Sequence, residues 1–76
     1  MREEIKFAYE ELANAIVELA AKDYVAALRH LKNDPGSENA RGEVVRLERF
    51  FHSDWYEMLT DLDAEYLIRE IRKMVG

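Results

Sequence analysis

The chain has 76 residues, enough for one small domain and too few for two independent hydrophobic cores. Apolar residues make up 49% and charged residues 36%, with three Gly and one Pro, which excludes a disordered chain and a loop-rich all-β fold. The absence of Cys excludes a disulfide scaffold, a thiolate nucleophile and a Cys-ligated zinc finger. We therefore expect a single domain over residues 1–76.

Charge and hydropathy limit the partners of the chain. Eleven basic and sixteen acidic residues give a net charge of −5, which repels a phosphate backbone and makes nucleic acid an unfavourable partner. No apolar run approaches the roughly 18 residues that a membrane span needs, so we expect no membrane association. Glu3 and Glu4 stand where a signal peptide needs positive charge, which favours a cytoplasmic protein.

Residues 3–32 predict one long helix, because they contain no Gly or Pro and are rich in Ala, Leu, Glu and Lys. Two apolar rows follow helical spacing: Ile5, Tyr9, Leu12, Ile16 and Leu19, and beside them Ala13, Val17, Ala20, Tyr24, Leu28 and Leu31. So broad a stripe predicts a helix packed against two neighbours. Asp23 interrupts the first row, so a kink near Lys22 is the alternative. The turn sequence Asn33-Asp34-Pro35-Gly36 predicts the end of this helix.

The rest of the chain predicts two or three shorter helices. Ser37 or Asn39 can cap the first of them. One face of this helix carries Val44, Leu47 and Phe51, and the same helical spacing continues through Trp55, Met58 and Leu62. His52-Ser53-Asp54 predicts a break, with Ser53 capping a helix over 54–60. The last helix is expected after Asp63, with the core row Ala64, Leu67, Ile68, Ile71 and Val75. The prediction is an all-α bundle of three or four helices with a long N-terminal helix.

A bundle of this size has a marginal core of its own, which favours a homo-oligomer. The aromatic residues support this, since Phe50, Phe51, Trp55 and Tyr56 fall within seven positions. Consecutive helical residues diverge by about 100°, so Phe50 and Phe51 cannot share one face, nor can Trp55 and Tyr56. Either a compact bundle surrounds all four side chains, or one of each pair faces a second surface.

Catalytic and metal-binding patterns are weak, and we expect no enzyme and no cofactor. The hydroxyl groups of Ser37, Ser53 and Thr60 lie in no nucleophile motif. A calcium loop starting at Asp61 would have Tyr66 where Gly is needed and Arg72 where the bidentate acid belongs. His30 and His52 lack zinc-ligand spacing, so no metal site is predicted.

Binding is a better match to the remaining residues. Arg46 and Arg49 beside Phe50, Trp55 and Tyr56 could hold a phosphate and stack a base, in a pocket completed by a second chain. The alternative is that the same residues form an ordinary dimer interface. The acids from Asp54 to Asp63 form a second candidate face. Alternatively, the charged residues form solvated helix faces with ion pairs such as Glu43–Arg46 and Glu65–Arg69.

One stretch of the sequence carries a resemblance. Leu47-Glu48-Arg49-Phe50-Phe51-His52-Ser53-Asp54-Trp55, followed by Asp63-Ala64-Glu65-Tyr66-Leu67-Ile68, resembles small uncharacterised proteins of prophages and mobile elements in gut Gram-positive bacteria. The segments Ala15–Ala20 and Lys22–Tyr24 match this pattern more loosely. The resemblance carries no catalytic residues and implies an intracellular protein that acts in a bacterial host. It implies counter-defence, by binding a host immune protein or sequestering a nucleotide signal; the alternative is a structural or regulatory interaction module.

Overall fold

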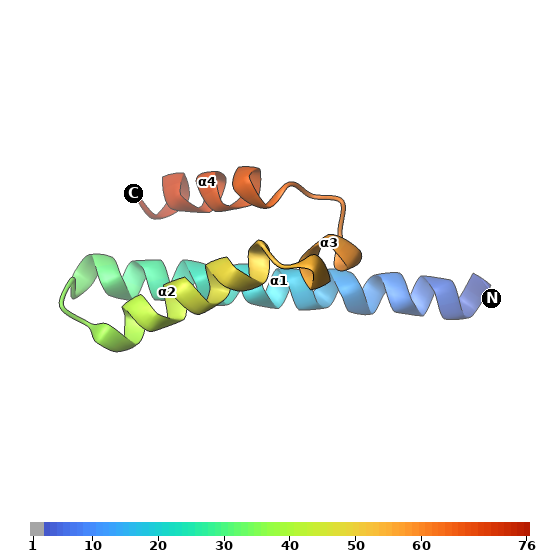
Figure 1. Cartoon of the computed structure of the whole chain (residues 1–76), viewed down its shortest axis with the longest axis horizontal. Coiled ribbons are helices and arrows are strands. Elements are labelled where there is room, and N and C mark those ends of the chain that lie inside the picture. Colours follow the sequence, from blue (N-terminus) through green and yellow to red (C-terminus); the bar gives the residue numbers. More distant parts are fainter. Residues whose placement is uncertain (1–2) are drawn as a thin grey trace.

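The computed structural model describes residues 3–76, which form four helices and no strand. These are α1 (Glu3–Asn33), α2 (Glu38–Phe51), α3 (Asp54–Leu59) and α4 (Ala64–Val75). In Figure 1, α2 returns along α1 from the turn, α3 crosses α1 near its middle, and α4 runs back beside α1. The predicted all-α bundle with a long first helix is confirmed.

The helix boundaries follow from local hydrogen bonds. α1 passes through Asp23 without a break, because that side chain is exposed and makes no demand on the packing. The helix ends where Asp34 N–H donates to His30 O at 2.8 Å. Ser37 caps α2, its Oγ accepting the Ala40 N–H at 3.2 Å, so Ser37 and not Asn39 is the N-cap.

The predicted break after Phe51 is confirmed, and α4 begins after Asp63 as expected. Ser53 caps α3 through the Tyr56 N–H, as the sequence predicts. Asp63 occupies the N-cap position of α4 with an extended backbone, but among residues 3–76 its carboxylate accepts no capping hydrogen bond. The start of α4 therefore depends on packing more than the start of α3 does.

The core lies where α2, α3 and α4 cover the C-terminal two thirds of α1. Its largest fully buried side chains are Tyr24, Phe51 and Tyr56, and it includes the predicted α2 and α4 positions. The buried α1 positions come from the second predicted row, which is confirmed as the core face. They are Ala13, Val17, Tyr24 and Leu28, with Ala27 beside them.

The expectation that α1 packs against neighbouring helices is confirmed, since α2, α3 and α4 all contact it, but within residues 3–76 these helices leave the first apolar row largely uncovered. Ile5, Tyr9, Leu12 and Leu19 are exposed, and Ile16 is half-buried. The cause is length: α1 has 31 residues and α2 only 14, or about 46 Å against about 21 Å of helix. The N-terminal part of α1 projects past the other helices (Figure 1), and the molecule measures 50 × 21 × 19 Å.

A polar cluster joins three helices at the edge of the core. Tyr24 of α1 donates its hydroxyl hydrogen to Glu48 Oε2 of α2 at 2.5 Å, and Arg72 of α4 donates to the same oxygen at 2.6 Å. Burial and the Glu48 hydrogen bond raise the pKa of Tyr24 to about 12. Burial alone would raise the pKa of Glu48, but the hydrogen bonds from Tyr24 and Arg72 and the Arg72 charge lower it. The cluster thus holds an ionised Glu48 between α1 and α4 at neutral pH.

Surface ion pairs follow the sequence only in part. Arg46 binds Glu43 at 2.5 Å, as predicted. The predicted Glu65–Arg69 pair is wrong: Glu65 Oε1 lies 3.3 Å from His52 Nε2, and the Arg69 guanidinium lies over the Tyr66 ring at 5.7 Å. Within residues 3–76, no helix combines the length and the hydropathy that crossing a membrane requires.

Candidate binding surface at the junction of α2 and α3

The junction between α2 and α3 determines which aromatic side chains reach the surface. His52 N–H donates to Glu48 O at 3.1 Å and ends α2. Ser53 then bridges the two helices, since its Oγ donates to Phe50 O at 2.6 Å and accepts the Tyr56 N–H at 3.2 Å. This bend changes the rotation of the chain, so Tyr56 and not Trp55 follows Phe51 into the core.

The four clustered aromatics therefore divide between the core and the surface. Phe51 and Tyr56 are buried, with ring centroids 5.8 Å apart, and Tyr24 meets Phe51 edge-on at 5.4 Å. Phe50 is half-buried, and Trp55 stands edge-on against it at 5.5 Å with 57% of its surface exposed. One member of the Trp55–Tyr56 pair faces outward, which is one of the two arrangements that the sequence left open.

Tyr56 is the predicted binding residue that the structure removes from the surface. It is 1% exposed, and its hydroxyl has no hydrogen-bond partner among residues 3–76. Burial raises its pKa, and the negative charge of Asp63 adds to this effect. We therefore leave Tyr56 out of the candidate surface.

Arg46 and Arg49 lie on the outer side of α2, away from the core. With Arg41 and Val45 they line a shallow, open groove along the helix. The Glu43 hydrogen bond raises the pKa of Arg46, and the charges of Glu43 and Asp23 act in the same direction. Arg46 lies one helical turn before Phe50 on α2, and the Phe50 ring contacts the Trp55 ring. We call Arg46, Arg49, Phe50 and Trp55 the Arg–aromatic face.

Four of the five acids between Asp54 and Glu65, all but Asp54, line a separate depression beside α3. Its lining includes Thr60, Asp61, Asp63 and Glu65. Within the described part of the chain, no three His, Asp or Glu side chains gather closely enough to hold a metal ion. The acids thus offer a negative surface without the geometry of a cation site.

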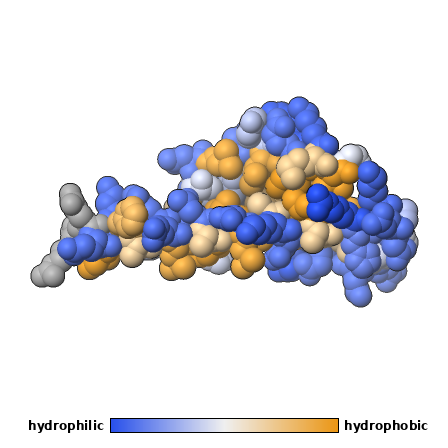
Figure 2. Space-filling view, turned by 180° about the vertical axis from the view of Figure 1, so that it is seen from behind, coloured by the Kyte–Doolittle hydropathy of each residue, from blue (hydrophilic) through white to orange (hydrophobic). Residues whose placement is uncertain are grey.

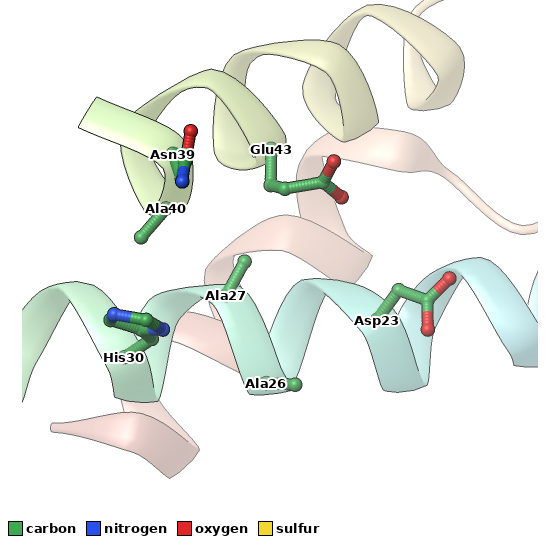
Figure 3. Close-up of a pocket in the computed structure, with 7 residues that line it drawn as sticks. All are labelled: Asp23, Ala26, Ala27, His30, Asn39, Ala40 and Glu43. Atoms are coloured by element: carbon green, nitrogen blue, oxygen red, sulfur yellow. The ribbon is translucent and has the colours of Figure 1, made fainter. Parts of the chain in front are cut away.

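Two features were not found by sequence reasoning. The first is the Tyr24–Glu48–Arg72 cluster. Its signal was Tyr24 in a core row, because the hydroxyl of a buried tyrosine generally needs a partner. The second is a groove between α1 and α2, lined by Asp23, Ala26, Ala27, His30, Asn39, Ala40 and Glu43. We call it the α1–α2 groove. In Figure 3, Ala27 and Ala40 extend from the two helices into the space between them, where larger side chains would fill it.

Comparisons with known proteins add no family. No protein-family model matches the chain, and searches of curated proteins and of solved structures returned no match.

Proposed function

We propose that the chain is a non-enzymatic protein-binding module that recognises a partner through the Arg–aromatic face. Exposed Trp55 is the observation that carries the proposal. Its ring is half in solvent and is supported by Phe50, on a helix held in place by the Ser53 cap. Tryptophan and arginine are the residues that most often dominate the energy of protein interfaces. A rigidly held tryptophan loses little conformational freedom on binding.

The charge of this face favours an acidic partner. Arg41, Arg46 and Arg49 lie along one side of α2, in a chain whose net charge is −5. Such a local positive surface steers an acidic protein to the correct side, while the rest of the chain repels extended polyanions. Nucleic acid is therefore not the proposed partner.

The biological role rests on the resemblance to prophage and mobile-element proteins. In that setting, a small cytoplasmic binding protein acts in counter-defence by occupying a surface of a host immune protein. A structural or regulatory interaction module would use the same face without inhibiting its target. Sequestration of a nucleotide signal is a second candidate, favoured by the three arginines along the α2 groove.

Capture of host proteins by immobilised chain tests the proposal, with four matched versions of the protein. Wild type and Met74→Ala, which alters an exposed apolar residue of α4, should retain the same host protein. Trp55→Ala and Arg49→Glu should lose it while their helical circular dichroism remains that of wild type. Equal capture by all four versions would exclude the Arg–aromatic face.

Fluorescence and mass then separate the candidates. Trp55 is the only tryptophan, so its emission reports on this face directly. Addition of the purified partner should shift the emission to shorter wavelength, because the exposed indole loses contact with water. Native mass spectrometry that finds a nucleotide on wild type, absent from Arg49→Glu, would favour sequestration instead.

A further inference from the structure

The exposed apolar row on the projecting part of α1 is spaced as a coiled-coil seam. Ile5, Tyr9, Leu12, Ile16 and Leu19 alternate in steps of four and three residues, the heptad pattern of two helices that wind around each other. We call these five residues the N-terminal row. Figure 2 shows apolar residues along this part of the molecule, with the projecting end on the left.

The same helix face continues into the α1–α2 groove. Two more steps of four and three lead from Leu19 to Asp23 and Ala26, and one more step of four leads to His30. These three residues are exposed and line the groove. One face of α1 therefore carries large apolar side chains in its first half and small or polar ones in its second half.

We propose that a second copy of the chain covers the N-terminal row, with the two α1 helices packed antiparallel. Each copy then places its N-terminal row against the α1–α2 groove of the other, in a two-fold symmetric contact. The sizes are complementary, because the large Tyr9 side chain meets the hollow left by Ala26, Ala27 and Ala40. The contact does not involve Phe50 or Trp55, although Glu43 of the groove binds Arg46 of the Arg–aromatic face.

Charge favours the antiparallel arrangement over the parallel one. One flank of the row carries Glu4, Glu11 and Glu18 in the first half of α1, then Lys22 and Arg29 in the second half. Antiparallel packing places Glu4 and Glu11 of one copy beside Arg29 and Lys22 of the other. Parallel packing in register would set acids against acids and the two Asp23 side chains against each other.

One heptad register places the N-terminal row of each copy against the second half of α1 in the other. Ile16 lies beside Leu19 of the second copy, Tyr9 beside Ala26, and Ile5 beside His30, so the helices overlap over nearly their whole length. Leu12 lies beside Asp23, whose charge is already close to Arg46. Opposed helix dipoles add to the preference for this direction.

The surface area agrees with a missing partner. The chain exposes 5825 Å². A compact monomer of 8.9 kDa is expected to expose about 4,800 Å². The excess of roughly 1,000 Å² is comparable with the ~800 Å² that each partner buries in a standard protein interface. A lipid surface suits the row less well, because its acidic flank repels anionic headgroups.

Sedimentation velocity of the full chain tests whether the row mediates self-association. Wild type should sediment as a dimer at micromolar concentration, and Leu12→Glu as a helical monomer. Met74→Glu places the same charge on an exposed apolar residue outside the contact and should remain a dimer. Trp55→Ala should also remain a dimer, which separates this proposal from that of the partner-binding face. A monomeric wild type, or a dimeric Leu12→Glu, would overturn the proposal.

Disulfide trapping tests the direction of the helices, since the chain contains no cysteine of its own. Ile5→Cys and His30→Cys, mixed and oxidised, should form the mixed disulfide, because the two positions are neighbours in the antiparallel pair. Ile5→Cys alone should not crosslink, because its two copies lie about 37 Å apart along the axis. Efficient crosslinking of Ile5→Cys alone would indicate parallel helices and contradict the proposal. His30→Cys alone is the matched control and should remain uncrosslinked.

Discussion

The two halves of α1 differ in environment far more than in sequence. Tyr24 in the second half is 0% exposed, packs against Phe51 and donates a hydrogen bond to Glu48. Tyr9 in the first half belongs to an equally regular apolar row but is 58% exposed. Both halves are rich in good helix formers, so helix propensity does not distinguish them. The difference shows that periodicity identifies an apolar face, while only the lengths of the other helices decide whether one chain covers it.

Replacing each tyrosine by alanine is the strongest way to test this difference. Tyr24→Ala removes a fully buried ring and leaves Glu48 without its hydroxyl donor, so we expect a loss of about 3–5 kcal/mol in the free energy of unfolding. Tyr9→Ala should change it by less than about 0.5 kcal/mol when measured on the monomer. Urea unfolding at low protein concentration measures both values. Equal losses would show that the two halves are equally packed.

The pH dependence of stability tests the polar cluster that anchors the packed half. The pKa of Glu48 is lower in the folded chain than in the unfolded chain. The unfolded chain therefore binds the proton first as the pH falls through about 4, and the stabilisation is lost as the pH falls further. Glu48→Gln should lower stability at pH 7 by about 1–3 kcal/mol and flatten the acid limb. Glu57→Gln, which changes an exposed acid of α3, serves as the control for net charge. If stability falls with acid identically in wild type and Glu48→Gln, Glu48 does not stabilise the fold through this cluster.

At high pH the same cluster should lose stability in the opposite direction, as the pH rises. The pKa of Tyr24 is raised to about 12, so its stabilisation is fully present below the ordinary tyrosine value and is lost as the pH rises through about 12. Tyr24→Phe should remove this alkaline loss, whereas Tyr9→Phe should retain it. Thermal unfolding between neutral and alkaline pH provides the comparison.

Removing the helix caps should have a smaller effect on stability, and it tests how the junction between α2 and α3 orients α3. Ser53→Ala removes the hydrogen bond to the Tyr56 N–H and should cost about 1 kcal/mol. Asp63→Ala alters the N-cap residue of α4, which makes no such bond, and should cost clearly less. Guanidinium unfolding of both variants measures the two costs. A larger cost for Asp63→Ala would show that the α4 cap forms in solution.

The smallest expected effect concerns the buried hydroxyl of Tyr56. Because this group has no partner among residues 3–76, its burial is a cost that Tyr56→Phe removes. The variant should be neutral or up to about 1 kcal/mol more stable, with unchanged dimer formation. A clear loss of stability would reveal a hydrogen bond, direct or through water, that the hydroxyl makes in solution.

Much of the fold was predictable, because local signals determine it. Ser37, Ser53 and the Asn33–Gly36 turn act through nearby backbone groups, so the helix boundaries follow from the sequence. The helical spacing of the apolar residues also predicts the core row through Tyr24. It does not predict whether the N-terminal row is covered, because that depends on how far α2 to α4 reach along α1.

The candidate surface was predictable only in part. The sequence points to Arg46, Arg49, Phe50 and Trp55, of which all but the half-buried Phe50 are exposed. Which of Trp55 and Tyr56 points outward depends on the rotation of α3 after Ser53. The α1–α2 groove joins residues 23–30 with residues 39–43, and no short-range pattern connects them.

Hydrogen exchange along α1 at several protein concentrations tests the central claim most directly, since it reports on both halves of one helix. Amides of residues 20–31 should be protected at every concentration, because the chain itself buries that half. Amides of residues 5–16 should exchange rapidly in dilute wild type and become protected as the concentration rises, and Leu12→Glu should abolish this change. Rapid exchange of residues 5–16 at all concentrations would contradict the account, because the N-terminal row would then have no second copy to cover it.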